Sequence, residues 1–312
     1  MPSPNAPTLF DPERIKAHRT RAAKRYGDYD FLKARVSREL IERLEDTPRH
    51  FPAVLEIGCH DGTLTRHLAA HSKIDHVIAT DPSPAMAHLA HAPPAISALP
   101  CSLENVPFAP ARFDLATSAL SLHWANDLPG TLVQVRQALK PDGLWLAAMF
   151  GAGTLTELRS VLSDAETELR GGVSPRLSPL PGLQDVAGLM QRTGFALPVV
   201  DTEPVTVRYD TMFKLLDDLR GMAEQAAFPA HLTSPLRRDV LMAAAQAYHE
   251  RFSDPDGRIR ATFEIIWLSG WAPSESQPKP LRPGSAKASL AAAVGGIEQS
   301  AGEKAGQGDD QA

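Results

Sequence analysis

The sequence predicts a doubly wound α/β fold, in which a largely parallel sheet is covered by helices on both faces. Between residues 54 and 150, short apolar runs of strand character alternate with stretches of helical periodicity, the order that builds a parallel sheet. The first two runs carry an acidic residue at their carboxyl ends, Glu56 and Asp81, and the first leads into a glycine-bounded turn within Val54–Gly62. Because open sheets bind ligands at the carboxyl ends of their strands, we expect both carboxylates at one binding edge.

Composition restricts the class of protein. The chain has 312 residues, 43% of them hydrophobic, which is enough for a large core. Its net charge of −5 argues against a general nucleic-acid binder, which usually presents a basic face. The two cysteines, Cys59 and Cys101, make no disulfide framework and fit a reducing compartment. With no apolar run long enough to span a bilayer and no signal pattern in Met1–Phe10, we expect a soluble, cytoplasmic protein.

Residues 1–50 predict a helical extension before the sheet. Apolar residues at helical spacing in Phe31–Leu44 predict an amphipathic helix that leads into the first strand. The segment before it carries one acidic residue, Glu13, against six basic ones: Arg14, Lys16, Arg19, Arg21, Lys24 and Arg25. Such a run is usually a solvated helix face; the alternative is a dock for an acidic partner.

The main domain, residues 51–272, begins with five expected strands. They are Val54–Ile57, Val77–Thr80, Ala95–Leu99, Phe113–Ala119 and Leu144–Phe150. Between the last two, Pro129–Leu139 has the periodicity of a helix. Lys140–Gly143 then predicts a turn, because proline and glycine do not extend a helix.

The pattern changes after Phe150. We expect helices at Thr154–Leu169, Leu183–Arg192, Met212–Met222 and Leu236–Phe252, extended structure at Leu197–Tyr209, and a strand at Thr262–Trp271. The segment of about 209–258 is a helical insertion expected to cap the binding cleft. The strand after it is expected to run antiparallel and complete the sheet. The polar, Pro- and Gly-rich tail at 273–312 is expected to be disordered.

The turn after the first strand is the first candidate binding site. Gly58 allows a ligand to approach the main chain closely, and Gly62 opens the next helix. The Glu56 carboxylate argues against a phosphate here because like charges repel, and no Gly-Lys-Ser/Thr sequence marks a P-loop. A zwitterionic amino-acid cofactor suits the turn better, since its ammonium group can pair with a carboxylate. The alternative is an ordinary turn between strand and helix.

Asp81 is the second candidate. A carboxylate at the end of a second strand can accept two hydrogen bonds from vicinal ribose hydroxyls. The alternative is a helix N-cap, for which aspartate is well suited. The preceding turn favours the ribose-binding interpretation.

These motifs resemble those of class I S-adenosylmethionine-dependent methyltransferases of the BioC type. The resemblance rests, in the order of that family, on Leu55–Cys59, Thr80–Met86, Val106–Phe108 with Phe113–Leu115, and Leu139–Gly143. It implies S-adenosylmethionine as cofactor, bound by Glu56, Gly58, Cys59, Gly62, Asp81, Pro82, Met86, Ser102, Leu103, Ser118 and Leu120. Two positions depart from the pattern. His60 replaces the usual middle glycine, and Ser102 replaces an acidic residue that often contacts the adenine.

A longer resemblance covers about residues 9–286. Ser121–Pro129, Gly171–Pro175, Met212–Glu224 and Glu275–Pro280 are similar to the methyltransferase-like assembly factors of mitochondrial complex I and their bacterial relatives. It leaves two activities open. One is methyl transfer to an unidentified acceptor. The other is modification of an arginine in a partner subunit of complex I, which is hydroxylation in the mitochondrial member.

His123 and Trp124 follow the fourth strand, where an acceptor would meet the cofactor. His123 is the candidate general base because its ordinary pKa lies near neutrality, and Trp124 is expected to close the substrate pocket. The alternative is a packed histidine beside a tryptophan. The histidine pairs His67/His71 and His88/His91 are expected on solvated helix faces, and we predict no metal site. His60 and Ser102 also motivate a third hypothesis, a non-catalytic binding protein on the same fold.

Overall fold

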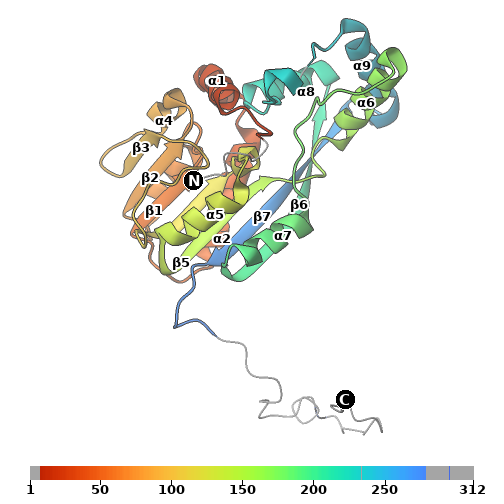
Figure 1. Ribbon diagram of the computed structural model, residues 1–312. Helices are drawn as coiled ribbons and strands as arrows, with labels where there is room; N and C mark the ends of the chain where they lie inside the picture. Colours follow the sequence, from red (N-terminus) through yellow and green to blue (C-terminus); the bar gives the residue numbers. More distant parts are fainter. Residues whose placement is uncertain (1–7, 233, 279–294, 296–312) are drawn as a thin grey trace. The chain divides into compact units, whose positions relative to one another are not determined.

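The computed structural model describes residues 8–232, 234–278 and 295 (Figure 1). The chain divides into two units, Met1–Ser274 and Glu275–Ala312, and all of the helices and strands among the described residues lie in the first. Most of the predicted tail at 273–312, like the end of the Glu275–Pro280 motif, lies outside the described residues.

The sheet of the first unit has seven strands in the order β3-β2-β1-β4-β5-β7-β6. The strands are β1 (Ala53–Ile57), β2 (His76–Asp81), β3 (Ile96–Pro100), β4 (Phe113–Ala119), β5 (Leu139–Phe150), β6 (Ala196–Tyr209) and β7 (Ile259–Trp271). The first five run parallel, and β7 is antiparallel to both β5 and β6. The predicted doubly wound α/β class is therefore confirmed, and the last strand enters between β5 and β6 rather than at the edge.

The helices follow the predicted alternation with strands. They are α1 (Pro12–Ala22), η1 (Ala23–Asp28), α2 (Phe31–Glu45), α3 (Thr63–Ala69), α4 (Pro84–Ala90), η2 (Leu122–Trp124), α5 (Leu128–Ala138), α6 (Thr156–Arg170), α7 (Leu183–Arg192), α8 (Met212–Gly221), η3 (Ala230–Leu232) and α9 (Arg238–Phe252). The insertion between β6 and β7 contains α8, η3 and α9, as expected.

The predicted turn at Lys140–Gly143 is wrong, because β5 already begins at Leu139. Leu139 pairs with Phe113, and the pairing resumes at Leu144 after a shift of register. Asp142 takes a positive φ of 63° within the shifted segment. The turn-forming residues therefore make an irregularity inside the strand instead of a break before it.

Apolar side chains fill both faces of the sheet. Val54 and Leu115 belong to one core cluster, with side chains of α2, α3, α6, α8 and α9. Their neighbours Leu55 and Ala116 belong to a second cluster, with side chains of α5 and α7. Because successive strand residues point to opposite faces, β1 and β4 are buried on both sides.

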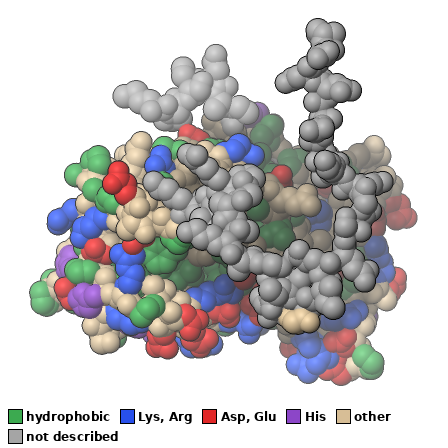
Figure 2. Space-filling view, turned by 90° about the horizontal axis from the view of Figure 1, so that it is seen from below, with side chains coloured by type: hydrophobic (Ala, Val, Ile, Leu, Met, Phe, Trp, Pro, Cys, Tyr) green, Lys and Arg blue, Asp and Glu red, His purple; other side chains and the backbone are tan. Residues whose placement is uncertain are grey.

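Helix α1 packs against α4 and α8 (Figure 1), so the N-terminal extension returns over the carboxyl ends of β1 and β2. Figure 2 shows the molecule turned by 90°. On the coloured part of this face, Lys and Arg side chains are interspersed with Asp and Glu side chains.

Candidate active site

The backbone turn after β1 has the conformation expected from its two glycines, Gly58 and Gly62. Gly58 and Cys59 donate their amides to the Thr80 carbonyl at 2.7 and 2.9 Å, which joins the turn to the end of β2. Gly58 and Gly62 have φ values of 72° and 85°, a region that side chains disfavour. A Cβ atom on Gly62 would also lie 2.7 Å from the Cα of Ala90. Both glycines are therefore required by the turn itself.

A buried lysine lies beneath this turn. Lys33, from α2, donates to the carbonyl oxygens of Gly58 and Ala119 at 3.0 and 3.1 Å. Its ammonium nitrogen is 3.9 Å from Oε1 of Glu56, and both side chains are almost fully buried. The sequence reasoning missed Lys33, although its spacing from Val36 and Leu40 placed it near the apolar face of its helix.

Glu56 has one satisfied oxygen and one unsatisfied oxygen. Oε2 accepts a hydrogen bond from Thr65 at 2.5 Å, whereas Oε1 has no hydrogen-bond partner in the described part of the chain. Burial raises the pKa of this carboxyl group to about 7, while the Lys33 charge opposes the rise. A buried acceptor without a partner is what a ligand ammonium group, directly or through water, would satisfy.

His60 points into the protein rather than towards solvent. It adopts a positive φ of 53°, and its Nδ1 lies 3.0 Å from both the Gly58 carbonyl and Lys33 Nζ. The Tyr26 ring stacks on the imidazole at a centroid distance of 5.2 Å. Burial, with the nearby charges of Arg19 and Lys33, holds the pKa of His60 well below its ordinary value, so the ring is neutral near pH 7.

Asp81 is paired with a residue of the N-terminal extension. Its Oδ2 accepts hydrogen bonds from Arg19 Nη1 at 2.6 Å and from the His60 amide at 3.0 Å. Its Oδ1 accepts from the Ser83 amide at 2.8 Å. Arg19 Nη2 also donates to Ser121 Oγ at 3.0 Å. The Arg19 and Asp81 side chains are only 1% and 0% exposed.

The Arg19–Asp81 pair corrects one expectation, and the cap of α4 excludes the alternative interpretation of Asp81. Arg19 lies on neither a solvated helix face nor a free docking face, because it shares the buried side of α1 with Ile15 and Ala22. Asp81 is also not the N-cap of α4. That role belongs to Ser83, whose hydroxyl oxygen accepts from the Met86 amide at 3.4 Å.

Most of the other predicted cofactor residues surround the same edge. Met86 is buried with Ala22, Ala23 and Tyr26 of the N-terminal extension. Cys59 and Leu103 are buried, and Pro82 and Ser102 line a shallow pocket beside α1.

Ser118 and Leu120 lie deeper, at the end of β4. The Ser118 hydroxyl donates to the Ile57 carbonyl at 2.7 Å and so links β4 to β1. Leu120 packs in the core and has a positive φ of 48°. Their roles in cofactor binding stay predictions.

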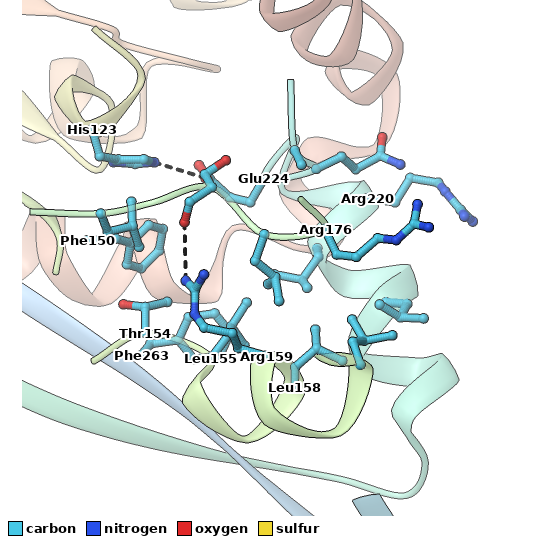
Figure 3. Close-up of a pocket in the computed structure, with 18 of the residues that line it drawn as sticks. His123, Phe150, Thr154, Leu155, Leu158, Arg159, Arg176, Arg220, Glu224 and Phe263 are labelled. Carbon is cyan, nitrogen blue, oxygen red and sulfur yellow. Dashed lines mark hydrogen bonds and ion pairs between the residues drawn. The ribbon is translucent and has the colours of Figure 1, made fainter. Parts of the chain in front are cut away.

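A further carboxylate, Glu224, follows α8 and contacts η2, in the pocket of Figure 3. Glu224 Oε2 is 3.0 Å from His123 Nε2 and accepts a hydrogen bond from Trp124 Nε1 at 3.1 Å. Within the residues that the structure describes, Glu224 Oε1 has no donor, and the buried His123 Nδ1 has no partner. The sequence reasoning did not single out Glu224, although it ends the distinctive Met212–Glu224 segment.

The pocket around Glu224 has a volume of about 230 Å³. Its walls include His123, Trp124, Phe150, Thr154, Leu158, Arg159, Arg176, Leu219, Arg220 and Phe263. Arg159 and Arg176 also line a neighbouring groove of about 470 Å³, which reaches Leu9 and Val173 on the surface. Arg176 is paired with Glu166, Arg159 donates to the Ser178 carbonyl at 3.2 Å, and Arg220 lies 3.9 Å from Asp217, so all three arginines of the pocket have partners.

Within residues 8–232 and 234–278, no three His, Cys, Asp or Glu side chains are grouped to hold a metal ion. His67 and His88 are exposed. No helix of the described chain is long and apolar enough to cross a membrane.

Comparisons with known proteins define the class of this chain. Residues 55–147 match the family described as "Methyltransferase domain". The YcgJ protein of Bacillus subtilis superposes with a TM-score of 0.53 and 16% identity, covering 75% of this chain and 98% of that one. A putative methyltransferase of Bacillus halodurans gives a TM-score of 0.53 at 15% identity, with coverage of 75% and 99%. The predicted methyltransferase domain and fold are therefore confirmed.

Longer sequence matches define the family. The chain is 39% identical over 292 residues to the mouse "Arginine-hydroxylase NDUFAF5, mitochondrial", covering 92% of this chain and 84% of that protein. The human protein of the same name is 38% identical over 291 residues, with the same coverage. The malonyl-[acyl-carrier protein] O-methyltransferase of Halorhodospira halophila is 31% identical over 254 residues, covering 80% and 84%. The chain belongs to the family of the arginine-hydroxylase NDUFAF5, and the predicted resemblance is confirmed.

Proposed function

We propose that this protein is an S-adenosylmethionine-dependent methyltransferase that acts on a side chain of a partner protein. The supporting observation is that two sites lie beyond the strand ends. One contains Glu56, Gly58 and Asp81, and the other is the Glu224 pocket, whose walls include His123 and Trp124 of the segment after β4. An acceptor held in the second site would face a cofactor held in the first.

The residues of the first site fit the cofactor in chemical type. Glu56 offers a buried oxygen that has no hydrogen-bond partner among the described residues, Gly58 allows close approach to the backbone, and Asp81 is a carboxylate at the end of the second strand. When bound, S-adenosylmethionine supplies a methyl group on a positively charged sulfur. The protein then needs mainly to hold a nucleophile in line with that group.

His123 and Glu224 would hold the acceptor and move its proton. A carboxylate beside Nε2 favours the tautomer with the proton on Nε2, which leaves the unpartnered Nδ1 as a base. Trp124 fixes the Glu224 carboxylate from a second direction. This arrangement supports the prediction that His123 is the general base and that Trp124 closes the pocket.

A second candidate function is modification of an arginine in a partner subunit of complex I. It is supported by the identity to proteins named arginine-hydroxylase and by Glu224 Oε1, an anionic acceptor in a pocket whose walls carry apolar side chains beside three arginines. A guanidinium group carries several donors in a planar fork, so it complements a carboxylate at the end of such a pocket. We keep the cytoplasm as the proposed location, although the mammalian relatives are named mitochondrial.

Two measurements test the proposal. Calorimetry with S-adenosylhomocysteine should show binding to the wild-type protein and weaker binding to Asp81→Asn; absence of wild-type binding would contradict the cofactor assignment. Mass spectrometry of complex I subunits from a deletion strain should show an arginine that has lost a modification, whose mass distinguishes a methyl from a hydroxyl group. If no arginine of these subunits differs in mass between the two strains, the arginine candidate is contradicted.

A further inference from the structure

The N-terminal arm, which we define as α1 and η1 (residues 12–28), places its own side chains on the predicted cofactor residues. Arg19 contacts Asp81 and Ser121, and Tyr26 stacks on His60. Thr20 is hydrogen-bonded to Ser83 at 2.8 Å. The arm therefore contacts the ends of β1, β2 and β4 at once.

Arg19 and a ribose would compete for the same carboxylate. Asp81 already accepts three hydrogen bonds, and its side chain has no exposed surface. A guanidinium–carboxylate contact is charge-assisted and stronger than a bond from a neutral hydroxyl. A ribose therefore cannot reach Asp81 while Arg19 occupies it.

The rest of the arm is attached by few large apolar groups. Its buried residues besides Arg19 are Ile15, Ala22, Ala23 and Tyr26. Alanine buries little apolar area, so the ion pair contributes much of the preference for the seated position. By contrast, α2 is anchored in the core through Leu32, Val36, Leu40 and Leu44.

We propose that the N-terminal arm is an autoinhibitory strap, in which Arg19 occupies the ribose-binding carboxylate Asp81 and must leave before the cofactor binds. This inference rests on the proposed cofactor site. In this proposal, Arg19 competes with the cofactor ribose for the Asp81 carboxylate. The apparent affinity for the cofactor is then the intrinsic affinity multiplied by the fraction of molecules whose arm is released.

Titration with S-adenosylhomocysteine tests the competition. Arg19→Gln removes the charge, so a strap that is seated in about nine molecules of ten predicts an affinity about tenfold higher than wild type. Arg21→Gln is the matched control, because Arg21 lies on the same helix and is exposed; it should bind like wild type. Unchanged or weaker binding by Arg19→Gln would overturn the strap but leave the cofactor site intact. No binding by any of the three proteins would overturn both the site and the strap.

Hydrogen exchange on the wild-type protein gives a second readout that requires no variant. Adding S-adenosylhomocysteine should speed amide exchange in residues 12–28, because the released arm loses its contacts, while α2 stays protected. Slower exchange in residues 12–28 on binding would show that the arm closes over the cofactor and would overturn the proposal. This measurement decides the question even if Arg19→Gln fails to fold.

Discussion

Asp81 and Glu224, two of the carboxylates near the carboxyl edge of the sheet, differ in what they contact. Asp81 has partners on both oxygens and is covered by an arginine of the same chain. Glu224 has partners on one oxygen, and the other is left within a pocket of about 230 Å³. The Asp81 site is thus occupied by an arginine of the protein itself, whereas Glu224 keeps one carboxylate oxygen available in its pocket.

The largest expected effect on stability comes from breaking the Arg19–Asp81 pair. Asp81→Ala removes the partner of the Arg19 charge, so the arm should be released, and a strap seated in about nine molecules of ten predicts a loss of about 1.4 kcal/mol in the free energy of unfolding. Urea denaturation measures it. The double variant Arg19→Met/Asp81→Ala should recover most of this loss, because no unpaired charge remains. A double variant that is as unstable as Asp81→Ala would contradict the assignment of the loss to the unpaired charge.

The next effect should appear in activity rather than stability. Glu224→Gln keeps the size of the side chain but removes the charge that faces the pocket. Turnover of the protein acceptor should fall by about 100-fold, the scale of one charge-assisted hydrogen bond. Binding of S-adenosylhomocysteine should not change. The control is Glu168→Gln on the exposed face of α6, and equal losses in both variants would remove Glu224 from the substrate site.

A smaller effect should appear in the pH dependence of stability. Burial raises the pKa of Glu56 to about 7, above the value of 4.5 expected when it is exposed. The folded state therefore binds more protons than the unfolded state between these values, and this group makes the protein less stable as the pH rises from 4.5 to about 7. Glu56→Gln should remove that contribution. Urea denaturation of both proteins across this range should show wild type losing stability relative to the variant; parallel curves would contradict it.

Much of the fold could be predicted because local patterns determine it. Phe113–Ala119 and Leu183–Arg192 begin and end as predicted, since apolar periodicity and flanking glycine or proline residues report on local structure. The structure of Lys140–Gly143 could not be predicted in this way, because pairing with β4 holds a turn-like sequence in an extended strand.

The site was predicted only in part. Glu56 and Asp81 were found because the ends of neighbouring parallel strands must meet. Their partners come from remote segments: Arg19 lies 62 positions from Asp81, and Glu224 lies 101 positions from His123. The spacing of residues along the chain does not predict contacts between such remote segments. A weaker signal did exist, because Arg19 stands at helical spacing between Ile15 and Ala22.

A crystal structure of the protein with S-adenosylhomocysteine tests the central claim most directly. We predict that the ribose hydroxyls contact Asp81, that the amino-acid end lies against Gly58 and Glu56, and that Arg19 has left Asp81. The Glu224 pocket beside His123 should stay open towards the sulfur. A cofactor bound elsewhere, or an Arg19–Asp81 distance still at 2.6 Å with the cofactor in place, would contradict this account.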